Sequence, residues 1–257
     1  HSHLYLKHFR EDIDAVEQRA REVLDAIYLP NVDLKTAVDM HALTDRDPSF
    51  YKPMMGLHPC SVPEDYEPVL EQIKAHLDSG AYTYYGIGET GLDLYWDKTS
   101  LERQQAALRV HVQWAKDYEL PIILHARDAI DETTDLIEAG NDAKLSGIFH
   151  CFDGSIEQAK RIIALGDFYI GIGGIVTYRK DVQAMAAELP LDRVVLETDS
   201  PYLPPEPHRR DKPRRNESSY TRYVGEKIAE LHGISYEEVA RITGENVKRL
   251  FPAISKI

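Results

Sequence analysis

Six histidine and carboxylate side chains lie at or near the ends of short apolar runs in this chain. They are His1, His3, Glu89, His125, His150 and Asp199. The run from Ile122 to Leu124, for example, stops at His125. Imidazole and carboxylate ligands suit zinc, manganese or magnesium, and a set without thiolates argues against a closed structural zinc site. The pattern therefore predicts a catalytic metal centre.

The elements that must position these residues alternate along the chain. Seven runs read as buried strands, at 26–29, 54–57, 84–88, 122–124, 147–149, 168–172 and 194–197. Helical patterns occupy 13–26, 66–77, 101–115, 128–138, 156–165 and 181–189, and three more at 220–232, 235–243 and 244–251 would close the fold. Such alternation indicates a parallel sheet, and 257 residues match the length of a (β/α)8 TIM-type barrel. We expect a single domain over residues 1–257.

All strands of such a barrel open their carboxyl ends on one face, so the six side chains would converge there. An eighth strand should precede His1 and carry His1 and His3 to that rim. Since the sequence starts at His1, we expect this first strand to be truncated. A metal ion held by His1 and His3 should then be bound weakly or be missing.

Charge and hydropathy narrow the class of protein. The formal net charge of -13 disfavours non-specific binding of duplex nucleic acid, which rewards cationic surfaces. A basic segment at 208–215 is the exception, and a solvated loop or a polyanion contact both fit it. No apolar stretch is long enough to span a bilayer, and two cysteines suit reduced thiols, so we expect a cytoplasmic protein without membrane contact.

The chain resembles the TatD-like metal-dependent hydrolases and deoxyribonucleases of the amidohydrolase superfamily over nearly its whole length. The resemblance is carried, in order, by His1-Ser2-His3, Gly56-Leu57-His58-Pro59, Gly88-Glu89-Thr90-Gly91-Leu92-Asp93, His125-Ala126-Arg127, His150-Cys151-Phe152, Glu197-Thr198-Asp199-Ser200-Pro201-Tyr202-Leu203 and Arg215-Asn216-Glu217. Seven motifs in the same order are highly specific.

The resemblance implies a dinuclear metal site. His1, His3 and Asp199 would hold one divalent ion, His125 and His150 the second, and Glu89 would bridge them. Many superfamily members use a carboxylated lysine as the bridge, whereas a glutamate stands at the corresponding strand end here. Two metals about 4 Å apart lower the pKa of a shared water and neutralise phosphoryl oxygens. Asp199 is our candidate general base.

Four further residues are candidates for binding substrate. His58 fits a hydrogen-bond donor to phosphate or a structural histidine, and Arg127 fits a partner for a ligating carboxylate or a phosphate contact. Tyr95, followed by Trp96, fits a platform for an unpaired base or ordinary loop packing. Arg215 is a candidate phosphate contact, although Ser218 stands where the family has proline, which leaves the course of that loop open.

Three hypotheses on function follow. The leading one is a divalent-metal-dependent phosphodiesterase that removes nucleotides from single-stranded DNA ends. The second is an ester or amide hydrolase with the same site, such as a D-aminoacyl-tRNA deacylase. The third is a metal-binding or scaffold protein without catalysis. No obligatory protein partner is evident in the sequence.

Overall fold

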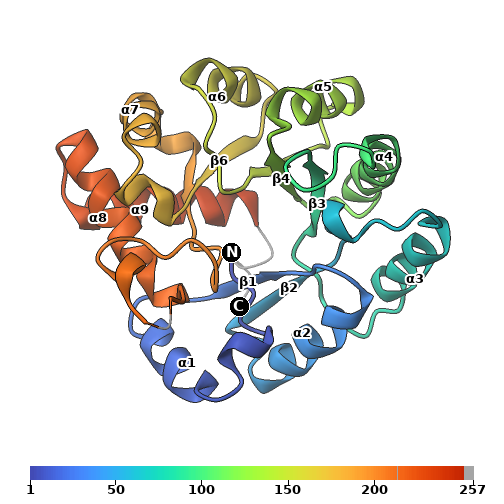
Figure 1. Cartoon of the computed structure of the whole chain (residues 1–257), viewed down its shortest axis with the longest axis horizontal. Helices are drawn as coiled ribbons and strands as arrows, with labels where there is room; N and C mark the ends of the chain where they lie inside the picture. The colour runs from blue at the N-terminus through green and yellow to red at the C-terminus, as the bar shows by residue number, and fades with distance from the viewer. Residues whose placement is uncertain (213, 252–257) are drawn as a thin grey trace.

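The computed structural model describes residues 1–212 and 214–251, and within them parallel strands form a ring surrounded by helices (Figure 1). The strands are β1 (Ile27–Pro30), β2 (Tyr51–Met54), β3 (Ile87–Asp93), β4 (Ile122–Arg127), β5 (Gly147–Phe149), β6 (Phe168–Ile172) and β7 (Val194–Leu196). The helices are α1 (Ile13–Arg21), α2 (Leu34–Arg46), α3 (Glu67–Asp78), α4 (Leu101–Asp117), α5 (Ile130–Gly140), α6 (Ile156–Ile163), α7 (Lys180–Glu188), α8 (Thr221–His232) and α9 (Tyr236–Leu250). This is the α/β TIM-barrel fold that the alternation predicts.

The ring closes through the first three residues. Strands β3 to β7 pair in parallel in chain order, β1 pairs with β2, and a bridge between Met55 and Ile87 joins these two sheets. On the other side, Ser2 forms a parallel bridge with Ser200 and donates its backbone N–H to Tyr28 O at 3.0 Å. Residues 1–3 therefore occupy the position between β7 and β1, where the eighth strand was expected to come before His1.

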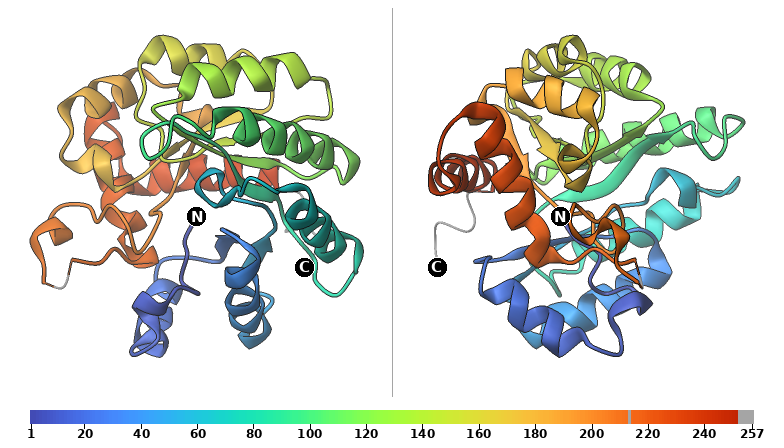
Figure 2. Two further views of the ribbon diagram at one scale, coloured as in Figure 1. Left: turned by 45° about the vertical axis from the view of Figure 1, so that its right-hand side comes forward. Right: turned by 60° about the vertical axis from the view of Figure 1, so that its left-hand side comes forward.

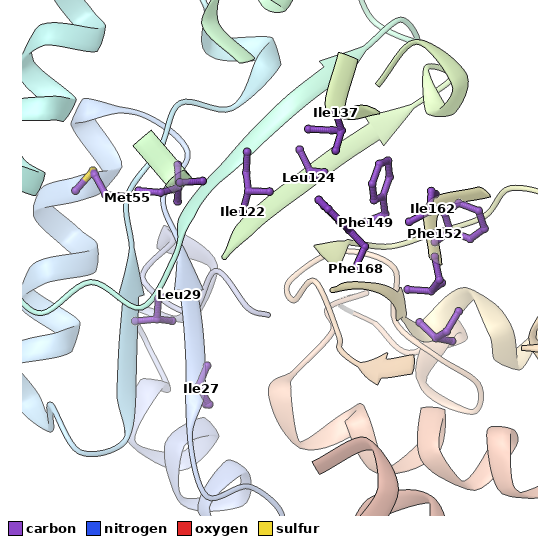
Figure 3. Close-up of a cluster of buried hydrophobic side chains, with 14 of the residues drawn as sticks. Ile27, Leu29, Met55, Ile122, Leu124, Ile137, Phe149, Phe152, Ile162 and Phe168 are labelled. Atoms are coloured by element: carbon purple, nitrogen blue, oxygen red, sulfur yellow. The ribbon is translucent and has the colours of Figure 1, made fainter. Parts of the chain in front are cut away.

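The strands bury both faces, as parallel strands under helices must. Outward side chains such as Leu124, Phe149 and Phe168 pack beneath the helices against Ile137 and Ile162, as Figure 3 shows. Alternate residues form a second cluster inside the ring, made of Met54, Ile123, Ile148, Tyr169, Val195, Leu250 and Phe251. Because side chains alternate along a strand, the inner face continues two residues further along each strand. Those residues include His125, His150 and Glu197.

Most predicted strands and helices have different bounds in the structure, and three of the differences bear on the fold or the site. The second strand is β2 at Tyr51–Met54, earlier than the predicted 54–57, and the third extends to Asp93 instead of ending at Gly88. Glu89 thus lies within β3 and not at a strand end. The two final helices are one, α9, because Gly244 sits in open space and a helix tolerates it there.

Helix α2 was not predicted. Its start has a capping box, in which Asp33 accepts from Thr36 N at 2.8 Å and Thr36 Oγ1 accepts from Asp33 N at 2.9 Å. This reciprocal pair satisfies backbone donors at a helix start and was readable in the sequence. Among the described residues, none of the helices combines the length and the apolar character needed to cross a membrane.

Candidate metal centre

Two groups of nitrogen and oxygen atoms meet around Glu89 at the carboxyl end of the ring. The first, called the His1 group, consists of His1 Nε2, His3 Nε2 and Asp199 Oδ1. Within it, the nitrogens are 3.2 Å apart and lie 3.5 and 3.2 Å from the Asp199 oxygen. Glu89 Oε2 faces the group at 3.4 Å from His1 and 3.3 Å from His3.

The second, called the His125 group, faces the other oxygen of the same carboxylate. Glu89 Oε1 lies 3.0 Å from His125 Nδ1, 2.8 Å from His150 Nε2 and 3.3 Å from His58 Nε2. His150 Nε2 and His125 Nδ1 are 3.4 Å apart. Each oxygen of Glu89 therefore serves a different group, which is the geometry of a bridging carboxylate.

The spacing of these atoms fits a divalent cation. Nitrogen and oxygen ligands about 2.0 to 2.1 Å from a tetrahedral ion are about 3.3 to 3.4 Å from one another. The five measured separations in the His1 group, with Glu89, fall between 3.2 and 3.5 Å. Atoms that each offer a lone pair gather this closely only around a proton or a metal, so the donor set fits the metal that the sequence predicts.

The charges of the buried side chains at the centre also favour a bound cation. Burial acts to raise the pKa of Glu89, but the positive charge of protonated imidazoles, first of all that of His150, holds that pKa well below its usual value. Burial acts to lower the pKa of His3, but hydrogen bonds to Asp199 and Glu89 raise it to about 10. The buried carboxylates thus require positive charge beside them, which a divalent cation supplies in place of imidazole protons.

A bulge in β3 brings Glu89 to this position. The pairing of β3 with β4 shifts register between Ile87 and Thr90. Just beyond, Gly91 has a φ of 141°, a region that side-chain-bearing residues rarely enter, and a Cβ placed on it would lie 1.9 Å from the carbonyl oxygen of His125. Glycine therefore lets the two strands approach closely enough for Glu89 to reach both groups.

Hydrogen bonds outside the centre orient two of the imidazoles. His125 Nε2 lies 2.9 Å from Asp93 Oδ2, and a carboxylate there keeps the proton on Nε2 and the lone pair on Nδ1. His3 Nδ1 lies 2.7 Å from Tyr5 Oη, whose own proton goes to the carbonyl oxygen of Pro30 at 2.5 Å. Tyr5 must therefore accept from His3, which leaves Nε2 of His3 free to act as a ligand.

Glu197 was missed as a site residue in the sequence, although it stands in a quoted motif. It is buried, and its Oε2 lies 3.3 Å from His1 Nδ1 and 3.7 Å from His150 Nδ1, two nitrogens that form no well-aligned hydrogen bond. Its Oε1 accepts from Cys151 N. Because Nε2 of both imidazoles faces Glu89, we place Glu197 outside the two groups as their orienting carboxylate. The sequence signal that could have identified Glu197 is its position two residues after the inward-facing Val195, which places it on the same face.

His58 differs from the other histidines of its group. Its Nδ1 accepts the backbone N–H of Cys60 at 3.1 Å, so in the neutral ring the proton sits on Nε2, which faces Glu89. Burial, together with the neighbouring His125, lowers its pKa and favours this neutral form, although Glu89 opposes the shift. The contacts support His58 as a hydrogen-bond donor more than as a ligand.

Arg127 and the aromatic pair lie together at the rim. The Arg127 guanidinium stacks 3.7 Å above the Tyr95 ring and 5.6 Å from that of Trp96. Within the described ranges it makes no ion pair with a carboxylate, so the contacts do not favour a role in orienting a ligand. Tyr95 and Trp96 are 52% and 70% exposed, and their backbone N–H groups both donate to Asp93 Oδ1.

Arg215 forms ion pairs with two carboxylates of the chain. Its guanidinium donates to both carboxylate oxygens of Asp12 at 2.7 Å and to Glu217 Oε1 at 3.0 Å. Arg19 pairs with the same Glu217 at 2.8 Å. These contacts tie the segment after β7 to α1, next to the N-terminal residues (Figure 2). They favour a structural role for Arg215, and its contact with phosphate stays a prediction.

The barrel presents two groups of potential metal ligands, and comparison with known proteins identifies the chain as a metal-dependent hydrolase. A family model described as TatD related DNase matches residues 1–252. The metal-dependent hydrolase YabD of Bacillus subtilis, itself uncharacterised, is 37% identical over 98% of this chain and 97% of its own. The crystal structure of YjjV, a TatD homologue from Escherichia coli, superposes with a TM-score of 0.90 at 30% identity, covering 98% of this chain and 96% of that one.

A relative with a named activity is the 3'-5' ssDNA/RNA exonuclease TatD of a Rahnella strain. It is 30% identical over 95% of this chain and 93% of its own length. The chain therefore belongs to the TatD-related DNase family, and it is a metal-dependent hydrolase with the fold of the amidohydrolase superfamily.

Proposed function

We propose that this protein is a phosphodiesterase that uses two divalent ions, zinc, manganese or magnesium, to remove nucleotides from the ends of single-stranded DNA. The observation that carries the proposal is the division of Glu89, whose Oε2 faces the His1 group while its Oε1 faces the His125 group. One ion would be held by His1, His3 and Asp199, and the other by His125 and His150, with Glu89 shared.

Divalent ions in such a site lower the pKa of a coordinated water and neutralise charge on phosphoryl oxygens. Asp199 is our candidate to take the proton of the attacking water, because its side chain is 14% exposed while that of Glu89 is 3% exposed. His58 is placed to donate from Nε2 to a phosphate oxygen, since Cys60 fixes its tautomer. A cytoplasmic location remains a prediction.

The rim supports a single-stranded substrate. Trp96 and Tyr95 offer exposed rings, and stacking of a base on an aromatic side chain contributes about 1 to 3 kcal/mol without regard to sequence. Arg127 keeps its charge next to those rings and can meet a phosphate. The activity of the Rahnella relative on single strands also supports the proposal.

The test supplies manganese, magnesium or zinc to the purified protein and follows a 3′-labelled single-stranded oligonucleotide beside a D-aminoacyl-tRNA. We expect release of nucleotides that Glu89→Gln and Asp199→Asn abolish and that the exposed control Glu157→Gln leaves unchanged. Turnover of the aminoacyl ester alone would favour the deacylase hypothesis. Turnover of neither substrate, or turnover unaffected by both substitutions, would refute the proposal.

A further inference from the structure

A second pairing of arginine with tyrosine lies on the rim, and its arginine belongs to the basic segment 208–215. The guanidinium of Arg209 lies 4.1 Å above the ring of Tyr178. Tyr178 follows β6, directly after the short helical turn Gly174–Thr177, and Arg209 lies in the segment that follows β7. Tyr178 is half-buried and the Arg209 side chain is 43% exposed. The pair repeats the arrangement of Arg127 on Tyr95.

The two loops that carry this pair are fastened to each other. Glu206 N donates to Thr177 Oγ1 at 2.9 Å. Gly174 packs so closely that an added Cβ would lie 2.3 Å from the carbonyl oxygen of Leu203. The position of Tyr178 relative to Arg209 is therefore set by backbone contacts and does not depend on the stack alone.

The two pairs lie across the mouth of the ring from each other. Tyr95 follows β3 and Arg127 is the last residue of β4, while Tyr178 and Arg209 follow β6 and β7. With residues 1–3 as the eighth position of the circuit, β3 and β7 are four places apart and β4 and β6 are two places apart. Figure 1 likewise shows β3 and β4 on the opposite side of the ring from the segment after β7. The metal centre lies between the pairs.

We propose that Tyr178 and Arg209 form a second nucleobase platform, so that the substrate lies across the centre with one unpaired base on each side of the scissile phosphate. This inference rests on the proposed phosphodiesterase function and names its substrate more closely. Unpaired bases stack on aromatic rings and on guanidinium planes alike, and the arginine adds charge that favours the strand. Bases that are paired in a duplex are not free to part toward two platforms.

The contacts of the pair with its surroundings leave room for such a ligand. Among the residues that the structure describes, Glu206 is the one carboxylate that Arg209 approaches, at 3.9 Å, which is a weak ion pair at an exposed site. The neighbouring Arg179, in contrast, is bound to Asp153 and Asp181. Arg209 thus keeps most of its hydrogen-bonding capacity for a phosphate or base.

The test compares Tyr178→Leu with Tyr178→Phe, which keeps the ring, and Arg209→Gln with Arg222→Gln. Arg222 is the matched control because it also lies over a tyrosine, Tyr236, at 5.7 Å, but on the outer helices. We expect Tyr178→Leu to raise KM for a single-stranded oligonucleotide about tenfold with kcat unchanged. Tyr178→Phe and Arg222→Gln should behave as the parent, and Arg209→Gln should resemble Tyr178→Leu.

Two further measurements separate this inference from the proposed function. Hydrolysis of methyl p-nitrophenyl phosphate, which has no nucleobase, should be equal in all variants. If Tyr178→Leu leaves KM for the oligonucleotide within about twofold of the parent while that ester is hydrolysed, the platform is refuted and the phosphodiesterase stands. If the parent hydrolyses neither substrate, fluorescence anisotropy of a labelled oligonucleotide in EDTA decides. A tenfold lower affinity in Tyr178→Leu supports the platform, and an unchanged affinity refutes it.

Discussion

The Asp93 carboxylate contacts the candidate metal ligand His125 through one oxygen and the backbone of the aromatic turn at Tyr95 and Trp96 through the other. Its Oδ2 lies 2.9 Å from His125 Nε2, and its Oδ1 accepts from the backbone of Tyr95 and Trp96 at 3.0 and 3.1 Å. Burial acts to raise its pKa, but hydrogen bonds, first of all to His125, lower that pKa to about 2. Asp93 is therefore ionised at neutral and mildly acidic pH.

Replacement of Asp93 by asparagine should weaken metal binding. The amide would donate to His125 Nε2 and leave the proton on Nδ1, which faces Glu89. Loss of such an orienting partner typically lowers metal affinity 10- to 100-fold. Titration of the metal-free protein against a chelator of known affinity measures the change. Asp97→Asn in the same loop is the control, and equal affinity in Asp93→Asn and the parent would show that Asp93 does not set the tautomer.

Glu89→Gln and Asp199→Asn should differ in how many ions they release. Glu89 serves both groups, so its loss should empty both, whereas Asp199 belongs to the His1 group and its loss should spare the His125 group. Metal content after dialysis against trace chelator gives the count. The same titration of the parent tests whether the His1 group binds more weakly, and simultaneous filling of both groups would contradict that expectation.

Gly91→Ala should destabilise the fold by at least about 3 kcal/mol, because the new methyl group meets the His125 carbonyl oxygen at 1.9 Å in a backbone conformation unfavourable to alanine. Gly244→Ala is the opposite case, since Gly244 lies inside α9 and nothing comes within 4 Å of the place that an alanine methyl group would take. There alanine should stabilise by about 0.5 to 1 kcal/mol. Urea unfolding of both variants measures the change in the free energy of unfolding, which should fall for Gly91→Ala and rise for Gly244→Ala.

His111 should make stability fall in mild acid. Burial lowers its pKa from 6.5 to about 4, and it accepts the backbone N–H of Leu57 through Nε2. The unfolded chain takes up a proton below pH 6.5 that the folded one refuses, so this contribution is complete above pH 6.5. It declines by about 3 kcal/mol as the pH falls to 4. His111→Gln should flatten that part of the stability curve, whereas the exposed His8→Gln should not.

The sequence predicted those elements whose pattern is local and missed those set by packing. Strands β5 and β6 were placed with their observed bounds because each is a short apolar run, which ends at His150 after β5 and at the glycine pair Gly173-Gly174 after β6. Strand β2 was misplaced because Tyr51 and Lys52 do not read as a buried strand, yet Lys52 is buried with its ammonium on Pro48 O at 3.1 Å. Only the surrounding fold provides that acceptor.

The site residues also divide into those that a local sequence pattern identifies and those that only the packing of the fold reveals. His125 and His150 were identifiable because apolar runs stop at them, although β4 continues past His125 to Arg127 in the structure. Glu89 was identified through its motif, but its place inside β3 depends on a bulge that pairing with β4 creates. Glu197 was overlooked because its role depends on which face of β7 it occupies, and that becomes visible only when Val195 is known to point inward.

The ring closes at residues 1–3, where Ser2 forms a bridge with Ser200 and a hydrogen bond to Tyr28. His1 and His3, on either side of Ser2, belong to the His1 group of candidate ligands. Binding of an ion by the His1 group should therefore also stabilise the closed ring. Removal of the ions should first increase the rate of amide hydrogen exchange at Ser2 and His3 and at the residues that pair with them. The far wall of the barrel, at β4 and β5, should keep its protection.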